Sequence, residues 1–234
     1  MAAPTKAANL KTVIVGSTRK HSASVIFLHG SGDTGEGVLG WIRSLVQDAF
    51  RIPHVKFIFP SAPARPYTPA GGALSTVWYD RVRIAPNVPE LLETINPLCE
   101  QLGKLIDAEV AGGIPQNRII LGGFSMGGGM AMHLAYRFHH DAAGVFALSS
   151  FLNEDSVVYK VMTSKACLPP LFACQGLRDN LVLSDWSKET VRQLSDRGAL
   201  CEYHTFPKLY HEMNAQELHM LTDWIKKQVP DDGS

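Results

Sequence analysis

The stretch GFSMG, Gly123 to Gly127, places Ser125 between two glycines where an apolar run meets a helical pattern. The apolar run RIILGG before it and the segment MGGGMAMHLAYRF after it supply the strand and the helix that a G-x-S-x-G nucleophile elbow requires. A turn this sharp leaves no room for side chains at Gly123 and Gly127, and it puts helix N-terminal N–H groups beneath the serine. The alternative is a glycine-rich helix start that Ser125 merely caps. We expect Ser125 to be a nucleophile.

A serine hydroxyl needs a histidine base, which in turn needs a carboxylate to orient it. Elbow enzymes present these groups in the chain order Ser, Asp/Glu, His. Asp179 follows the apolar run PLFACQG, where Gly176 opens the turn, and His211 lies between the strand pattern CEYHTF and the last helical pattern. We therefore predict that Ser125, Asp179 and His211 form a catalytic triad. The competing acids and histidines lie in helical or strand patterns or too early in the chain: Asp141, Asp155, Asp185, Asp196, His139, His140, His204 and His219.

An oxyanion hole needs two N–H donors aimed at the charge that develops on the substrate. The residue after the nucleophile, Met126, is expected to give one backbone N–H. The loop FLHGSGDTG, residues 27–35, is expected to give the other from Ser31, with Gly30 letting the backbone curl toward the serine. His29 precedes the serine, so we expect it to brace this loop.

Short apolar runs alternate with longer amphipathic segments along the chain. The runs that predict strands are KTVIVG, SVIFLHG, VKFIFP, RIILGGF, AGVFALSS, PLFACQG and CEYHTF. Helical patterns cover Gly37–Ala49, Pro89–Ala111, Met126–Phe138, Ser184–Arg197 and Ala215–Gln228. This alternation predicts an α/β fold, a mostly parallel central sheet with helices on both faces. We expect a single domain over residues 1–234, with flexible termini at residues 1–9 and 230–234.

The walls of the site are harder to predict. The Pro- and Gly-rich segment SAPARPYTPAGGA, residues 61–73, is expected to be a long loop at the rim of the site, since ligands bind at the carboxyl ends of parallel strands. Leu152 and the neighbouring residues 157–159 could line an acyl groove or pack in a helix. Trp78 could brace the site or belong to the core.

Composition limits the function classes. The 234 residues are 45% hydrophobic and 19% charged with a formal net charge of zero, which argues against a nucleic-acid partner or a polybasic membrane anchor. The cysteines have no metal-ligand spacing, and we expect no metal and no cofactor: Cys99, Cys167, Cys174 and Cys201. No signal peptide or lipidation motif is evident, so we expect a cytosolic protein with at most transient membrane contact.

These motifs resemble the acyl-protein thioesterase and lysophospholipase family of α/β-hydrolases, especially its lysophospholipase-like branch. The resemblance runs from Ser24 to Val229 and includes FLHGSGDTG, RIILGGFSMGG, VWYD at residues 77–80 and the spacing of Asp179 and His211. It implies a serine hydrolase that cleaves fatty-acyl thioesters or related esters, on an acylated protein or a small acyl ester. We expect a monomer or weak homodimer. Typical members read GFSQGG and HGLGD, so Met126 and Ser31 are departures that alter the walls of the acyl site.

Three alternatives remain. A short-chain carboxylesterase with a shallow acyl site, or a lysophospholipase, would carry the same catalytic residues. A non-catalytic binding protein on a hydrolase fold would not need the intact set Ser125, Asp179 and His211.

Overall fold

The computed structural model describes residues 10–162 and 168–231. The predicted flexibility of residues 1–9 and 232–234, and the predicted state of Cys167, lie outside these ranges. Pro230 and Asp231, which were also expected to be flexible, have partners: Arg118 Nη2 donates to the Pro230 carbonyl at 2.8 Å, and Arg19 Nη1 lies 3.4 Å from Asp231 Oδ2. The C-terminal segment is therefore held against the body of the protein up to Asp231.

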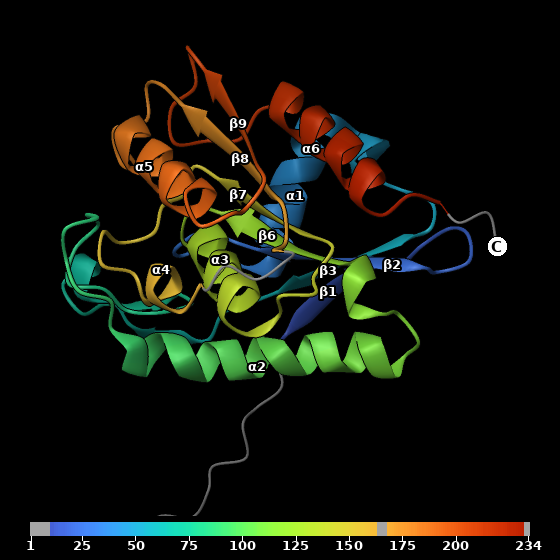
Figure 1. The fold of residues 1–234 in the computed structure, drawn as a ribbon, viewed down its shortest axis with the longest axis horizontal. Coiled ribbons are helices and arrows are strands. Elements are labelled where there is room, and N and C mark those ends of the chain that lie inside the picture. The colour runs from blue at the N-terminus through green and yellow to red at the C-terminus, as the bar shows by residue number, and fades with distance from the viewer. Residues whose placement is uncertain (1–9, 163–167, 232–234) are drawn as a thin grey trace, which may run out of the picture.

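The described residues form a seven-stranded sheet in the order β1-β3-β2-β6-β7-β8-β9, in which β1 alone runs antiparallel (Figure 1). Its strands are β1 (Thr12–Val15), β2 (Ala23–Leu28), β3 (Val55–Pro60), β6 (Ile119–Phe124), β7 (Gly144–Leu148), β8 (Leu171–Gly176) and β9 (Cys201–Phe206). The helices are α1 (Gly35–Val46), α2 (Leu92–Ala111), α3 (Met126–Phe138), α4 (Val157–Val161), α5 (Ser184–Ser195) and α6 (Ala215–Gln228). Short 3-10 helices span Gln47–Phe50, Thr68–Ala70 and Gln116–Arg118. The predicted α/β architecture is confirmed.

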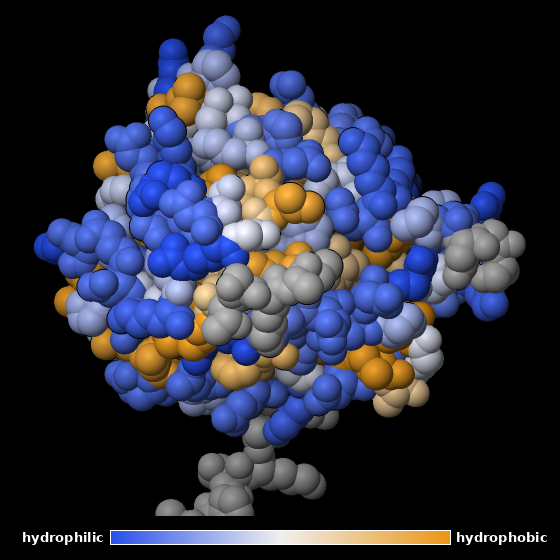
Figure 2. All heavy atoms as spheres, viewed as in Figure 1, coloured by the Kyte–Doolittle hydropathy of each residue, from blue (hydrophilic) through white to orange (hydrophobic). Residues whose placement is uncertain are grey.

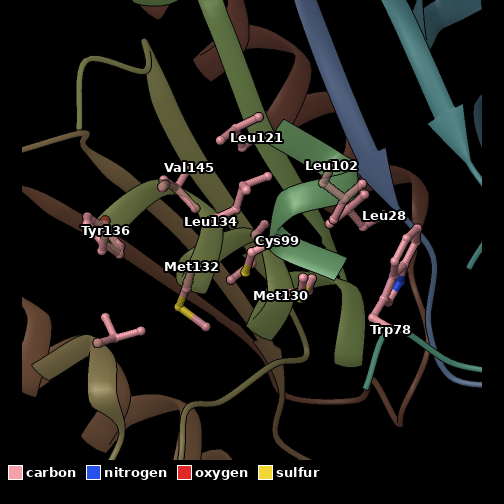
Figure 3. Packing of buried hydrophobic residues seen from close by; sticks show 14 of the residues in the cluster. Leu28, Trp78, Cys99, Leu102, Leu121, Met130, Met132, Leu134, Tyr136 and Val145 are labelled. Carbon is pink, nitrogen blue, oxygen red and sulfur yellow. The ribbon is translucent and has the colours of Figure 1, made fainter. Parts of the chain in front are cut away.

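Helices cover both faces of the sheet, so its central strands are buried on both sides. Along β2, Val25 and Phe27 pack into one core with α1 and α6, whereas Ile26 and Leu28 pack into the other with α2 and α3. Figure 3 shows part of the second core, where Met130 and Leu134 of α3 lie near Leu102 of α2 and Trp78 lies beside the end of β2. Because each strand must serve two cores, its sequence reads as a continuous apolar run.

Two expectations about the connecting segments are wrong. The 61–73 segment is not simply a loop, because β4 (Ala64–Pro66) pairs with β5 (Leu74–Thr76) as a small antiparallel hairpin. Helix α2 begins at Leu92 and not at Pro89, because Glu90 turns inward: its Oε2 accepts the Val157 N–H at 2.9 Å and its Oε1 lies 3.2 Å from His133 Nε2. Tertiary partners outweigh the local helix-start signal here.

No helix among the described residues is long and apolar enough to cross a membrane. The face of the molecule in Figure 2 is mostly hydrophilic, with hydrophobic residues in small groups.

Candidate active site

Ser125 stands alone between β6 and α3, at the carboxyl end of a strand in the middle of the sheet. Its backbone has φ +53° and ψ −121°, a region that side-chain-bearing residues rarely occupy and that costs on the order of 1–3 kcal/mol. The Ser125 N–H donates to the Leu148 carbonyl at 2.8 Å, which ties the turn to neighbouring β7. Strain of this kind lifts the hydroxyl clear of both the strand and the helix.

The glycines on either side of Ser125 are required by close packing against β2. A Cβ on Gly123 or Gly127 would collide with the Leu28 carbonyl oxygen, and at Gly127 it would also crowd the His29 carbonyl oxygen at 2.6 Å. The backbone of α3 therefore approaches the end of β2 as closely as glycine permits. This contact brings the first turn of α3 up to the loop after β2.

His211 joins the serine to a carboxylate. Its Nε2 lies 3.0 Å from Ser125 Oγ, and its Nδ1 lies 2.7 Å from Asp179 Oδ2. An ionised carboxylate only accepts hydrogen bonds, so Nδ1 carries the proton and Nε2 is left to accept from the serine hydroxyl. Sequence reasoning placed these three residues at different strand ends, and the structure brings them together in the geometry of a nucleophile, a base and its orienting acid.

Asp179 is buried, and several donors fix its carboxylate. Its Oδ1 accepts the N–H groups of Leu181 and Val182 at 2.9 and 2.8 Å, and Oδ2 also accepts from Gln175 Nε2 at 3.1 Å. Burial acts to raise the pKa of Asp179, but the hydrogen bonds from His211 and these backbone groups outweigh it and leave the pKa below its ordinary value. The acid is therefore charged at neutral pH. Gln175, which sequence reasoning missed, helps to hold it.

Two backbone N–H groups beside the serine are available as donors. In the part of the chain that the structure describes, neither the Ser31 nor the Met126 N–H has a hydrogen-bond acceptor. The two residues touch, since Ser31 Oγ lies 3.7 Å from Met126 Sδ. An oxyanion formed at Ser125 would supply the acceptor that both groups lack.

His29 braces the loop that carries Ser31. Its Nε2 accepts the Ala62 N–H at 2.9 Å, so its Nδ1 carries the proton and donates to the Gly30 carbonyl at 2.7 Å. Burial lowers the pKa of His29 despite the opposing Gly30 carbonyl and Asp33 carboxylate, and this favours the neutral ring. Trp78 Nε1 donates to the His29 carbonyl at 2.8 Å. Trp78 is fully buried, so it supports the loop from the core.

A cavity of about 250 Å³ opens beside Ser125 and His211. Its wall is largely apolar, from Trp41, Ile84, Phe124, Phe151, Leu181 and Val182. Leu152 and Trp78 are not among its lining residues: Leu152 lies in the core, and its neighbour Phe151 faces the cavity instead.

Residues 61–73 do not line this cavity either; Arg81 and Ile84 of the following segment do. The β4–β5 hairpin supports the loop that carries Ser31, because the Thr76 backbone carbonyl accepts the Gly32 N–H at 2.9 Å. Of the other residues named as candidate lining, Val158 and Tyr159 are buried in α4. Arg81, Ile84 and Phe151 carried no sequence signal, because isolated residues of irregular segments show no periodicity.

The described residues contain no cluster of three or more His, Cys, Asp or Glu side chains that could hold a metal ion. Cys99, Cys174 and Cys201 are free thiols.

A mostly parallel sheet covered on both faces, with a strained serine between strand and helix and a histidine and aspartate after later strands, defines an α/β-hydrolase. The model of the Phospholipase/Carboxylesterase family matches residues 9–229. The chain belongs to this family and is a serine hydrolase.

Named relatives support the same assignment. Lysophospholipase-like protein 1 of Mus musculus is 50% identical over 231 residues, which cover 98% of this chain and 97% of the relative. Acyl-protein thioesterase 1 homolog 2 of Dictyostelium discoideum is 30% identical, over 92% of this chain and 97% of the relative. The crystal structure of Zea mays acyl-protein thioesterase 2 has a TM-score of 0.78 at 23% identity, covering 94% of this chain and 99% of that chain, and supports the fold.

Proposed function

We propose that this chain hydrolyses acyl thioesters and related carboxylic esters, with Ser125 as nucleophile, His211 as base and Asp179 as the orienting acid. The observation that carries the proposal is the line of hydrogen bonds from Asp179 Oδ2 through the His211 ring to Ser125 Oγ, at 2.7 and 3.0 Å. The names of the relatives, an acyl-protein thioesterase and a lysophospholipase-like protein, agree with this class of substrate.

The reaction proceeds through an acyl-enzyme. His211 Nε2 takes the proton of Ser125 Oγ as the oxygen attacks the acyl carbonyl carbon, and the N–H groups of Ser31 and Met126 stabilise the oxyanion. The carbon–sulfur or carbon–oxygen bond then breaks, and His211 gives its proton to the leaving thiolate or alkoxide. Water attacks the acyl-enzyme in the same way, with His211 as base, and releases the acid and free Ser125. One lost oxyanion donor typically costs about 3–4 kcal/mol of transition-state stabilisation.

The size of the cavity favours short acyl chains. Pockets for drug-sized ligands usually hold about 300–1,000 Å³, and the cavity at Ser125 measures about 250 Å³. The apolar side chains of Phe124, Phe151 and Leu181 suit a hydrocarbon segment, but a long chain would have to leave the cavity. Among the alternatives raised by the sequence, this favours the short-chain esterase over depalmitoylation of proteins.

Where the enzyme works is also part of the proposal. The free thiols of Cys99, Cys174 and Cys201 fit a reducing compartment, and we place the protein in the cytosol as a monomer or weak homodimer that takes acylated proteins or small acyl esters.

A series of acyl esters and acyl thioesters with straight chains of two to sixteen carbons tests this function, with Ser125→Ala as the control for uncatalysed hydrolysis. We expect kcat/KM to be highest for the short acyl groups and to fall by about tenfold or more, equivalent to about 1.4 kcal/mol, at the longest. Rates that keep rising with chain length would contradict the short-chain preference and support depalmitoylation.

A further inference from the structure

Two charged side chains, Arg81 and Asp33, line the cavity beside Ser125. The carboxylate of Asp33 is already engaged at the start of α1, where its Oδ1 accepts the Thr34 N–H at 2.7 Å. The same oxygen packs so closely against Gly37 that a Cβ there would collide with it. Its charge therefore faces the N-terminal end of the α1 dipole, which favours an anion. Within residues 10–162 and 168–231, Arg81 has no ion-pair partner.

The guanidinium of Arg81 lies against two aromatic rings. Its central carbon is 4.9 Å from the centroid of Tyr79 and 5.5 Å from that of Phe151, and its Nη2 donates to Tyr79 Oη at 2.9 Å. Arg81 Nε is buried without a hydrogen-bond partner, and no carboxylate of the described residues lies within 4.0 Å of the guanidinium. Of the five N–H donors of this guanidinium, one has an acceptor among the described residues.

Tyr79 does not neutralise this cation. Burial raises the pKa of Tyr79, against the opposing effect of Arg81 itself, so the phenol stays uncharged at neutral pH. The two aromatic rings hold the guanidinium plane by cation–π attraction. Arg81 is half-buried and lines the cavity, so the terminal N–H donors that Tyr79 does not engage can face a ligand there.

The segment that carries Arg81 is held by contacts both before and after that residue in the chain. Before Arg81, Asp80 accepts from the backbone N–H of Thr68 at 2.9 Å and from its hydroxyl at 2.6 Å. After it, Glu90 is held by the Val157 N–H and by His133. A guanidinium presented by an anchored segment is preorganised, so little freedom is lost when it binds.

We propose that Arg81 binds an anionic group of the substrate, so that the preferred substrates are acyl esters or thioesters carrying a carboxylate or phosphate near the scissile bond. The planar edge of a guanidinium matches two oxygens of either group. This inference rests on the proposed hydrolysis at Ser125. It adds a specificity-determining residue for the same site and places a charge in a cavity whose wall is otherwise mostly apolar.

Paired substrates test the proposal and show which part of the substrate carries the charge. For the acyl side, the hexanoyl thioester and the adipoyl monothioester of one thiol are compared, because the second carries a terminal carboxylate in place of a methyl group. For the leaving group, butyryl esters of 4-hydroxybenzoate and of its methyl ester differ in the same way. The quantity measured is the ratio of kcat/KM for the anionic and the neutral substrate, in which a general loss of activity cancels.

We expect this ratio to exceed one in at least one arm for the wild type and to fall about tenfold or more in Arg81→Met, with Arg81→Lys between them. Arg83→Met is the matched control, because Arg83 is exposed, bonds Asn87 and does not line the cavity. Its ratio should equal that of the wild type.

An unchanged ratio in Arg81→Met, or a wild-type ratio below one in both arms, overturns the proposal. Fluorophosphonate labelling of Ser125 checks that each variant has an assembled site. If Arg81→Met is not labelled, the wild-type ratio alone tests the proposal. Failure of the wild type to hydrolyse the neutral substrates is a separate outcome, because it would refute hydrolysis at Ser125 before the role of Arg81 arises.

Discussion

At the scale of single residues, the geometry at Ser125 depends on the lack of side chains at Gly123 and Gly127. Ser125 can hold its φ of +53° because the strands and α3 pack around it without side chains at Gly123 and Gly127. The carbonyl oxygen of Leu28 fills the space beside both glycines. Glycine is therefore required here by close approach of the backbones, although neither glycine has a positive φ.

Adding one methyl group at Gly127 should test this packing. Gly127→Ala would force Cβ into the carbonyl oxygens of Leu28 and His29, so we expect a loss of about 1–3 kcal/mol or more in the free energy of unfolding, together with a loss of activity. Gly40→Ala is the matched control: Gly40 lies exposed in α1 with no atom near its missing Cβ, and alanine should stabilise the protein by about 0.5–1 kcal/mol. Denaturant unfolding measures both, and equal stability of the two variants would refute the packing argument.

The positions of the three proposed catalytic residues could be predicted because each lies in the segment that follows a strand whose apolar run is visible in the sequence. This placement and the chain order Ser, Asp, His set Ser125, Asp179 and His211 apart from rivals, most of which lie in helical or strand patterns. The cavity wall was not predictable in this way. Arg81 and Phe151 reach it from irregular segments whose paths depend on contacts made after folding, such as Trp78 with His29 and Asp80 with Thr68.

At the scale of elements, helix α6 buries an ionisable side chain, that of Glu217. Asn214 caps the helix by accepting the Glu217 N–H at 2.8 Å, and the side chain of Glu217 is fully buried. Among the described residues neither carboxyl oxygen has a hydrogen-bond partner of ordinary geometry, and the Cys174 thiol is the side-chain group that acts on it. Burial raises the pKa of Glu217 to about 8, against smaller opposing effects of the Asn214 backbone and the Cys174 thiol. The structure therefore favours the protonated acid.

Replacing this ionisable side chain should change how stability depends on pH. A folded-state pKa above the unfolded value means that the folded protein binds the extra proton, so the stability contributed by Glu217 is full below about pH 4.5 and declines as the pH rises to about 8. The stability of Glu217→Gln relative to the wild type should therefore rise over this window, by a few kcal/mol at most.

Denaturant unfolding at several pH values measures that difference. The control is Glu212→Gln, since Glu212 is exposed and its carboxylate stays hydrated. A difference between Glu217→Gln and the wild type that does not vary with pH would contradict the account.

At the scale of the whole molecule, the order of the strands assembles the site. The loop after β2 brings Ser31, β6 ends at Ser125, and the segments after β8 and β9 bring Asp179 and His211. These strands share one direction, so their carboxyl ends meet at one edge of the sheet, where open α/β sheets bind their ligands. Ser125 and His211, which are 86 positions apart in the chain, thus lie within hydrogen-bonding distance.

Such an arrangement could be predicted in outline, since alternating strands and helices imply a parallel sheet and a parallel sheet aligns its strand ends. The β4–β5 hairpin and the start of α2 at Leu92 could not be predicted from the sequence. Both depend on long-range partners, such as the Gly32 N–H at Thr76 and the His133 side chain at Glu90, that compete with local propensity.

The most direct test of the central claim is to treat the wild type with a fluorophosphonate and locate the adduct by mass spectrometry of the digested protein. The account predicts one covalent adduct, on Ser125, with no labelling of Ser125→Ala and strongly reduced labelling of His211→Ala. An unlabelled Ser125 in the folded wild type, or an adduct on another residue that remains in Ser125→Ala, would contradict the assignment of Ser125 as the nucleophile.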